Sequence, residues 1–398
     1  MDGSLTDVAS SRPAPAWRPR IVITLLIGYF VLFGITIGAQ GVLWAEIMTA
    51  LRLSEGALGS AQLASPLVSV GFLLGGGMLI SFMGKKRLAI IGLLVLGLSS
   101  IALAAAGNVW GLVGALLIAG AGFGAVEMVM NSATLDWEHA TGKAVMNGMH
   151  AGFSGGAVVG ALLAGLLLDR GWGYTDILWL LAFLAVAVLL VTLPTRYPPS
   201  AGDDMASESA SPLAALRLLS IPAILLLAII GLLGVVGESV ALSWSVIYLR
   251  QLGADVLIGG AAFALFNGMM FIARLLNAPL MARFGVRTSL LISGACVVVA
   301  GGMLMLPGQV WLATLAFALC GLGVAGVIPT VLSAAARIVP GSTGAVTGAI
   351  MAVAYFCFIV TPPLTGWIAE AFTLQAALLS VGLSGAAILL LASRVGSR

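Results

Sequence analysis

Residues 141–169 read TGKAVMNGMHAGFSGGAVVGALLAGLLLD, and residues 343–370 read TGAVTGAIMAVAYFCFIVTPPLTGWIAE. Both stretches are apolar and rich in small residues. Both open with Thr-Gly and close with a glycine that stands four positions before an acid. The two closing glycines, Gly165 and Gly366, are 201 positions apart. Similarity at a fixed spacing is the mark of an internal repeat.

A second pair of segments has the same spacing. GMLISFMGKKR (77–87) resembles APLMARFGVR (278–287), and Gly84 and Gly285 are again 201 positions apart. Small residues match by chance more easily than others do, but the shared offset favours a duplication of the whole first half of the chain.

Composition places both halves in a membrane. The chain has 398 residues, of which 61% are hydrophobic and only 8% are charged, and its mean hydropathy is +1.14. A soluble domain averages about 25% charged residues, so a bilayer must be the solvent. The net charge of +3 is too small to suggest nucleic acid as a partner. Cys296, Cys320 and Cys357 fall in different apolar segments, which favours packing roles, and we expect no metal site and no cofactor.

Apolar windows long enough to span a bilayer, about 20 residues each, number twelve. They lie at roughly 21–43, 57–80, 88–107, 111–134, 146–168, 176–193, 219–248, 256–280, 288–306, 310–333, 345–366 and 374–393.

The sequence therefore predicts an all-α membrane protein of twelve transmembrane helices in two pseudo-symmetric six-helix halves. The one long polar stretch, 194–218, is rich in Pro, Ser and acids and indicates a flexible linker. The predicted organisation is an N-terminal tail (1–20), a six-helix bundle (21–193), the linker (194–218), a second bundle (219–393) and a C-terminal tail (394–398).

Charge asymmetry orients the spans. With the N-terminus inside, the inner segments hold fourteen of the eighteen Lys and Arg residues, whereas the outer loops hold only Arg52, Arg170 and Arg250. Positive residues concentrate on the cytoplasmic side of membrane proteins. We therefore expect a multi-pass protein of the inner membrane with both termini and the linker in the cytoplasm.

Six-span halves related by duplication are a transporter architecture, with the binding site near the midplane between them. The chain resembles the major facilitator superfamily over essentially its whole length. The loop after span two carries that superfamily's Gly-x-x-x-Asp-Arg-x-Gly-Arg-Lys signature in degraded form, because Ser81 and Phe82 replace the acid and the first basic residue. This departure argues against an aspartate-based latch at the cytoplasmic side.

Within the superfamily, the pattern Gly122, Gly124, Glu127, Asn131 resembles span four of the fucose permease branch. The stretches WAEIMTALRLSEGALG (44–59) and GESVALSWSVIYL (237–249) resemble the YbjJ-like bacterial permeases of that branch. In the branch, the span-four glutamate belongs to the proton-coupling site. The aspartate that fucose permease has in span one is missing here, where the sequence reads Ala-Gln-Gly.

Ionised side chains inside a bilayer cost about 2.5–3.5 kcal/mol on insertion scales, so they usually face a cavity or a partner. Glu127 in span four is such a residue, and Asn131 lies one turn further on the same face. Glu127 could be a reversible proton carrier, or a permanently neutral acid that hydrogen-bonds between helices. Glu238, at mid-depth in span seven, could be a second titrating acid, a solute contact or an interhelical hydrogen-bonding group.

Four further residues are candidates for contact with the solute. Arg274 follows Asn267 by two turns in span eight. This arginine could pair with Glu238, hold an anionic solute or snorkel to the cytoplasm. Trp244 lies close to Glu238 in the sequence, and His150 in span five could be a ligand, a proton-transfer group or a packing residue.

Gln40 and Trp44 are one turn apart near the outer end of span one. Trp44 could anchor the helix at the membrane surface, or the pair could stack on and hydrogen-bond a sugar ring.

These observations predict a secondary active transporter, not an enzyme, because no catalytic constellation or phosphate loop is evident. We expect it to move a small polar solute, sugar-like or a related metabolite, by alternating access with protons, and to act as a monomer. A drug or metabolite exporter is the alternative transport function. A membrane sensor or assembly factor with the same fold, which transports nothing, is the alternative from another class.

Overall fold

The computed structural model describes residues 17–198, 217–339 and 343–396. Most of the predicted N-terminal tail and the middle of the predicted linker lie outside this range. Within it the chain is helical, with short turns between the helices and no strand. The elements are α1 (Pro19–Ala50), α2 (Glu55–Gln62), α3 (Ala64–Met83), α4 (Lys85–Ala104), α5 (Val109–Thr141), α6 (Met146–Asp169), α7 (Tyr174–Thr192), the 3-10 turn η2 (Leu218–Ser220), α9 (Pro222–Gln251), α10 (Val256–Leu304), α11 (Val310–Val324), α12 (Val327–Ile338), α13 (Thr343–Ala371) and α14 (Leu374–Ala392).

Two of the predicted spans are each broken into two helices. α2 ends at Gln62 and α3 begins at Ala64, because Pro66 has no N–H to donate to the carbonyl of the residue four positions earlier. α11 and α12 are separated in the same way at Gly326, three residues before Pro329. The breaks leave each span long enough to cross the bilayer.

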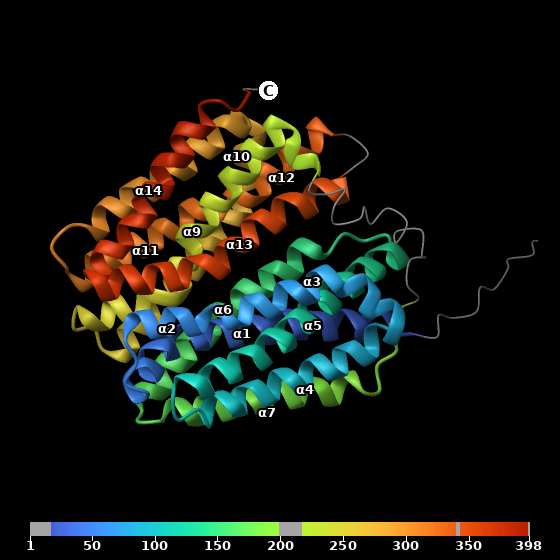
Figure 1. Ribbon diagram of the computed structural model, residues 1–398. Helices are drawn as coiled ribbons and strands as arrows, with labels where there is room; N and C mark the ends of the chain where they lie inside the picture. Colours follow the sequence, from blue (N-terminus) through green and yellow to red (C-terminus); the bar gives the residue numbers. More distant parts are fainter. Residues whose placement is uncertain (1–16, 199–216, 340–342, 397–398) are drawn as a thin grey trace, which may run out of the picture.

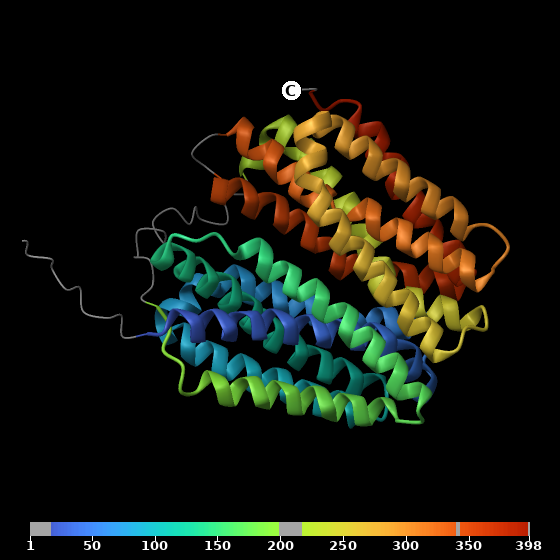
Figure 2. The same cartoon turned by 180° about the vertical axis from the view of Figure 1, so that it is seen from behind.

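The helices form two groups that meet at one end of the molecule. Figures 1 and 2 show α1–α7 in blue to green and α9–α14 in yellow to red, and the two groups diverge toward the end where α7 finishes and α9 begins. We call these groups the N-half and the C-half. The diverging end is the linker end, and the opposite end, which holds Ser54 and Asp255, is the far end.

The backbone confirms the predicted duplication. Gly84 has φ 79° and ψ 152°, and Gly285, 201 positions later, has φ 77° and ψ 170°. L-residues with a side chain rarely adopt such positive φ values, which is why glycine stands at both positions. In the C-half the backbone at Gly285 is not helical, so α10 is kinked there, and its two parts correspond to the eighth and the ninth predicted spans.

The matched glycines Gly165 and Gly366 lie where the halves cross. Gly165 of α6 faces Gly260 of α10, and a Cβ on Gly165 would lie 3.2 Å from the Gly260 Cα atom. Gly366 of α13 faces the backbone of Glu55 at the start of α2, and a Cβ there would overlap that backbone. Each half thus presents one glycine that lets a helix of the other half approach closely.

The outer surface suits lipid. Ten helical stretches within the described ranges are long and apolar enough to cross a membrane, with α11 and α12 counted as one stretch. The 49-residue α10 holds two crossings, and α2 together with α3 forms the twelfth. Large apolar side chains such as Phe183 of α7 and Leu383 of α14 are mostly exposed. This is a twelve-span, all-α membrane fold, as the sequence predicts.

Candidate transport site

Glu127 lies near the middle of α5 and makes a hydrogen bond to the other half of the molecule. The hydroxyl group of Tyr355, on α13, donates to the Glu127 carboxylate over 3.0 Å. Glycines on α5 allow this helix to pack closely on its neighbours: a Cβ on Gly122 would lie 2.7 Å from the backbone of Leu96, and one on Gly124 would lie 2.6 Å from Phe72. This close packing within the N-half holds α5 in place, with Glu127 on the side that faces the C-half.

Asn131 shares the α5 face of Glu127, as the spacing predicts, but it does not bond to the carboxylate. Its side-chain amide donates to the main-chain carbonyl of Glu127 over 3.0 Å. Within the described residues, the only hydrogen-bond donor to the Glu127 side chain is therefore Tyr355, and no ion pair is formed with it.

Arg274 links a second acid to the N-half. Its guanidinium lies 3.7 Å from the Glu238 carboxylate of α9 and donates to the Ser154 hydroxyl group of α6 over 2.9 Å. Snorkelling of Arg274 to the membrane surface, one of the three possibilities in the sequence, is therefore wrong. The Arg274 and Glu238 side chains are 34% and 22% exposed, so the pair lies at an accessible surface between the halves.

His150 lies one turn before Ser154 on α6. Its imidazole packs edge-on against the Phe30 ring, with the ring centroids 5.3 Å apart, and is exposed on its other side. The Ser154 hydroxyl group also donates to the main-chain carbonyl of His150 over 3.2 Å. The residues of the mid-depth contacts, together with His150, are called the central cluster: Glu127, His150, Ser154, Glu238, Arg274 and Tyr355.

The remaining predicted residues are not part of the central cluster. Gln40, Trp44, Trp244 and Asn267 are all buried, and each lies nearer to the far end along its own helix. Trp44 is only 8% exposed and packs in the core shared by the two halves. Its interpretation as an anchor at the membrane surface is therefore wrong. The Asn267 amide donates to the carbonyl of Phe263 within α10 over 2.9 Å.

Contacts between the halves close the far end. The Glu370 carboxylate accepts hydrogen bonds from the Ser54 hydroxyl group and the Gly56 N–H, each over 3.0 Å, at the start of α2. Gln251 donates to Glu55 over 3.1 Å. Further contacts of this kind join Trp367 to Ser60 and Arg250 to Glu46. Among the described residues, no hydrogen bond or ion pair joins the halves at the linker end.

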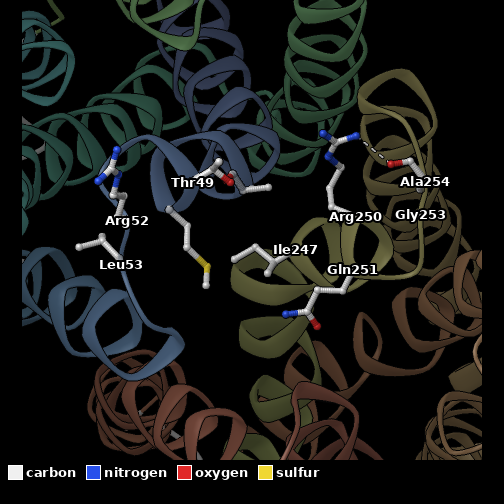
Figure 3. A pocket seen from close by; sticks show the side chains of 10 residues that line it. Thr49, Arg52, Leu53, Ile247, Arg250, Gln251, Gly253 and Ala254 are labelled. Atoms are coloured by element: carbon white, nitrogen blue, oxygen red, sulfur yellow. Dashed lines mark hydrogen bonds between the residues drawn. The ribbon is translucent and has the colours of Figure 1, made fainter.

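A cavity of about 570 Å³ lies above this closure, between the ends of α1 and α9. Figure 3 shows Arg52 and Arg250 on opposite sides of it. Arg250 is held by the carbonyl of Ala254, to which it donates over 2.8 Å. The cavity is open to the far side and does not reach the central cluster, so it is an outer vestibule rather than the transport site.

Tyr355 and Ser154 are the central-cluster residues that the sequence prediction missed. Tyr355 lies in an otherwise apolar window, and its partner Glu127 is 228 positions away. One signal could have found it: Ser154 and Tyr355 are 201 positions apart, which is the spacing of the duplicated glycines.

The sequence profile of the Major Facilitator Superfamily matches residues 25–357 and 260–396, which together cover most of the chain. The chain belongs to the major facilitator superfamily. It is 25% identical over 367 residues to "Membrane protein MosC" of Rhizobium meliloti, covering 91% of this chain and 87% of MosC. The superfamily prediction is thus confirmed, and the chain is a multi-pass membrane transporter rather than an enzyme.

Solved superfamily structures share the fold. The nucleoside transporter NupG superimposes with a TM-score of 0.81 at 14% identity, over 94% of this chain and 99% of NupG. The E. coli fucose:proton symporter FucP gives 0.62 at 18% identity, over 93% and 97%. A protein of the fucose-permease branch is therefore among the structures with this fold.

In the segment that carries the degraded superfamily signature, only some side chains make contacts with other helices. The hydroxyl group of Ser81 donates within its own helix, to the carbonyl of Met78 over 2.9 Å, and Phe82 is exposed. Lys85, the next basic residue of the signature, pairs with Asp136 at the end of α5. The loop between α3 and α4 is therefore tied to α5 inside the N-half, not to the C-half.

Proposed function

We propose that this protein is a secondary active transporter that moves a small polar solute, sugar-like or a related metabolite, across the inner membrane by alternating access, coupled to protons. The observation that carries the proposal is the hydrogen bond between Glu127 and Tyr355. It places a membrane-embedded carboxylate where the halves meet, so movement of the halves changes the surroundings of that acid.

The orientation follows from the charge distribution. Twelve of the sixteen basic residues in the described ranges lie at the linker end, so we assign this end and both termini to the cytoplasm. The far end then faces outside. Closure at the far end, with the halves diverging at the linker end, corresponds to an inward-facing carrier (Figure 1).

Glu127 is the proton carrier in this proposal. Glu238 is paired with Arg274, which stays protonated in proteins. The charge of Glu238 is thus already balanced, whereas the described residues supply Glu127 with a hydroxyl group and no cation. Glu127 is therefore the acid that can exchange a proton without breaking an ion pair.

The solute class rests on the chemistry of the site together with the relatives. The central cluster offers hydroxyl, imidazole and paired ionic groups, which suit a polar solute of low net charge. NupG is named a nucleoside transporter and FucP a fucose:proton symporter, and both solutes carry hydroxyl groups. We propose that the protein acts as a monomer, because each half-to-half contact described above is made within one chain.

Transport by purified protein in proteoliposomes tests the proposal, with labelled L-fucose, D-xylose and uridine as probes. Glu127→Gln cannot release a proton, so we expect accumulation driven by an imposed pH gradient to be lost while counterflow exchange persists. Asp176→Asn is the matched control, because the Asp176 carboxylate accepts a hydrogen bond from Gly173 within the N-half over 2.8 Å and makes no contact with the C-half among the described residues, and it should keep both activities.

Two results would contradict the proposal. Undiminished gradient-driven accumulation by Glu127→Gln would show that this acid carries no proton. If the wild-type protein moves none of the three probes in either assay, the sugar-like solute class is wrong.

A further inference from the structure

Gln62, the last residue of α2, carries a side-chain amide that is buried without a partner. The residue is only 7% exposed, and neither its Nε2 nor its Oε1 atom has a hydrogen-bond partner among the described residues. Burying a polar group without a hydrogen bond is unfavourable. A glutamine kept in that state indicates that something other than the folded chain uses the amide.

The break between α2 and α3 adds a backbone group at the same place. Pro66 has no N–H, so it cannot donate to the Gln62 carbonyl, and the helical hydrogen bonds resume with Leu67 donating to Leu63 over 3.2 Å. Interrupted helices in transporters expose such groups where solutes bind. The Gln62 carbonyl thus lacks its usual helical donor four residues later, at the same place as the unpartnered side-chain amide.

Along the length of the molecule, Gln62 lies between the closed far end and the central cluster. Gly59, one turn earlier on the same face of α2, packs against the carbonyl of Pro362 on α13. Going toward the linker end from this crossing, Gln62 is about 4.5 Å along α2, and Tyr355 is about 10 Å along α13. A solute held at the central cluster and extending toward the far end would reach the amide.

A second unpartnered donor lies in the same closed region. The Trp244 indole N–H has no partner among the described residues, although the side chain is fully buried. The Trp244 ring lies beside Gly366, which in turn contacts Glu55 at the start of α2. Both unpartnered groups are neutral, so they cannot balance the charge of an ion but can exchange hydrogen bonds with hydroxyl groups.

We propose that the Gln62 side-chain amide is a solute-binding group, which donates to and accepts from hydroxyl groups of an uncharged solute. This inference rests on the proposed transport function and narrows its solute class. In the inward-facing state the α2–α13 crossing separates the amide from the far side. When the far end opens, a solute that enters there meets Gln62 before it reaches the central cluster.

Thermal unfolding of the full-length protein in detergent, with and without L-fucose, D-xylose or uridine, tests this assignment. Gln62→Leu and the near-isosteric Gln62→Met remove an amide that the fold does not satisfy, so we expect Tm without probe to be unchanged or higher. The affinity for the probe that stabilises the wild type should fall roughly tenfold or more, the loss expected for a hydrogen bond to a bound hydroxyl group.

Gln375 supplies the matched control. Its Nε2 atom donates to the carbonyls of Leu304 and Leu306 over 2.9 and 3.0 Å, so its amide N–H groups are used by the fold. Gln375→Leu should lower Tm and leave probe affinity unchanged.

The outcomes separate the inference from the proposed function. A lowered Tm with wild-type probe affinity in both Gln62 variants would make Gln62 a structural residue and overturn the inference alone. A wild-type protein that none of the probes stabilises would overturn the proposed solute class, and the inference with it.

Discussion

Ser154 and Tyr355 occupy matched positions in the two halves, 201 residues apart, and each makes a hydrogen bond that crosses between the halves at mid-depth. Ser154 accepts from Arg274 of the C-half, and Tyr355 donates to Glu127 of the N-half. The duplicated helices α6 and α13 thus each form a hydrogen bond to the other half, but they use different side chains. Because both bonds join moving halves, both must be remade when the carrier changes state.

Removal of the Tyr355 hydroxyl group should uncouple transport from the proton. Tyr355→Phe keeps the ring but loses the bond to Glu127, so we expect gradient-driven accumulation of the three probes to fall severalfold while counterflow persists. Ser154→Ala leaves Glu127 and its partner intact. It should therefore have little effect on how strongly probe accumulation depends on the pH gradient. Equal losses of coupling in the two variants would show that Tyr355 acts only through packing.

The pair formed by Arg274 and Glu238 should stabilise the fold only while both members are present. Arg274→Ala leaves a carboxylate without its counter-ion, and we expect Tm to fall by several degrees. The double variant Arg274→Ala/Glu238→Gln should recover most of that loss, because the remaining amide carries no charge. Thermal unfolding of the three proteins in detergent measures this, and additive losses in the double variant would rule out the pairing.

Glu370 should hold the far end closed. Without its carboxylate, the start of α2 loses two hydrogen bonds, so Glu370→Ala should shift the population toward the outward-open state. We expect a cysteine at Ala45, which is buried beside the outer vestibule, to react faster with a membrane-impermeant thiol reagent. The experiment uses protein in which Cys296, Cys320 and Cys357 are replaced.

Asp176→Ala is the control for this labelling. Asp176 also lies at the far end, but it accepts from Gly173 within the N-half over 2.8 Å. Its loss should leave the labelling rate of the Ala45 cysteine unchanged. If Glu370→Ala labels no faster than this control, the carboxylate does not contribute to closure.

Membrane orientation can be checked with single cysteines at Ser207 and Gly253. The charge distribution predicts that the linker residue Ser207 is inside and that Gly253, between α9 and α10, is outside. Impermeant reagent added to intact cells should label only the cysteine at Gly253. Labelling at Ser207 from outside would reverse the assignment.

The sequence predicted the architecture well because two physical signals repeat along the chain. Apolar windows mark each crossing, and glycines at a constant offset mark the duplication. Gly84 and Gly285 are predictive because their positive φ values require glycine in both halves. The division of the second span at Gln62 was not predicted, although Pro66 signals it, because hydropathy does not respond to a single missing N–H.

The candidate site was predicted only in part. Glu127, Glu238 and Arg274 stand out because charges are rare in apolar windows, and the structure brings Glu238 and Arg274 together. Partners such as Tyr355 come from the other half and carry no charge, so hydropathy gives no sign of them. Gln62 lies close to a window boundary, where a polar residue is ordinary, and only its buried, unpartnered amide distinguishes it.

The ion pair of Arg274 with Glu238 also determines how the membrane voltage acts on the carrier. The pair is neutral as a unit, so on the proposed mechanism the centre has no net charge when Glu127 is protonated and one negative charge after the proton has left. Loaded with an uncharged solute, the carrier then moves no charge, and only its empty return step does. The negative interior of a cell repels the empty centre outward, by about 2.3 kcal/mol per 100 mV for one charge that crosses the whole field.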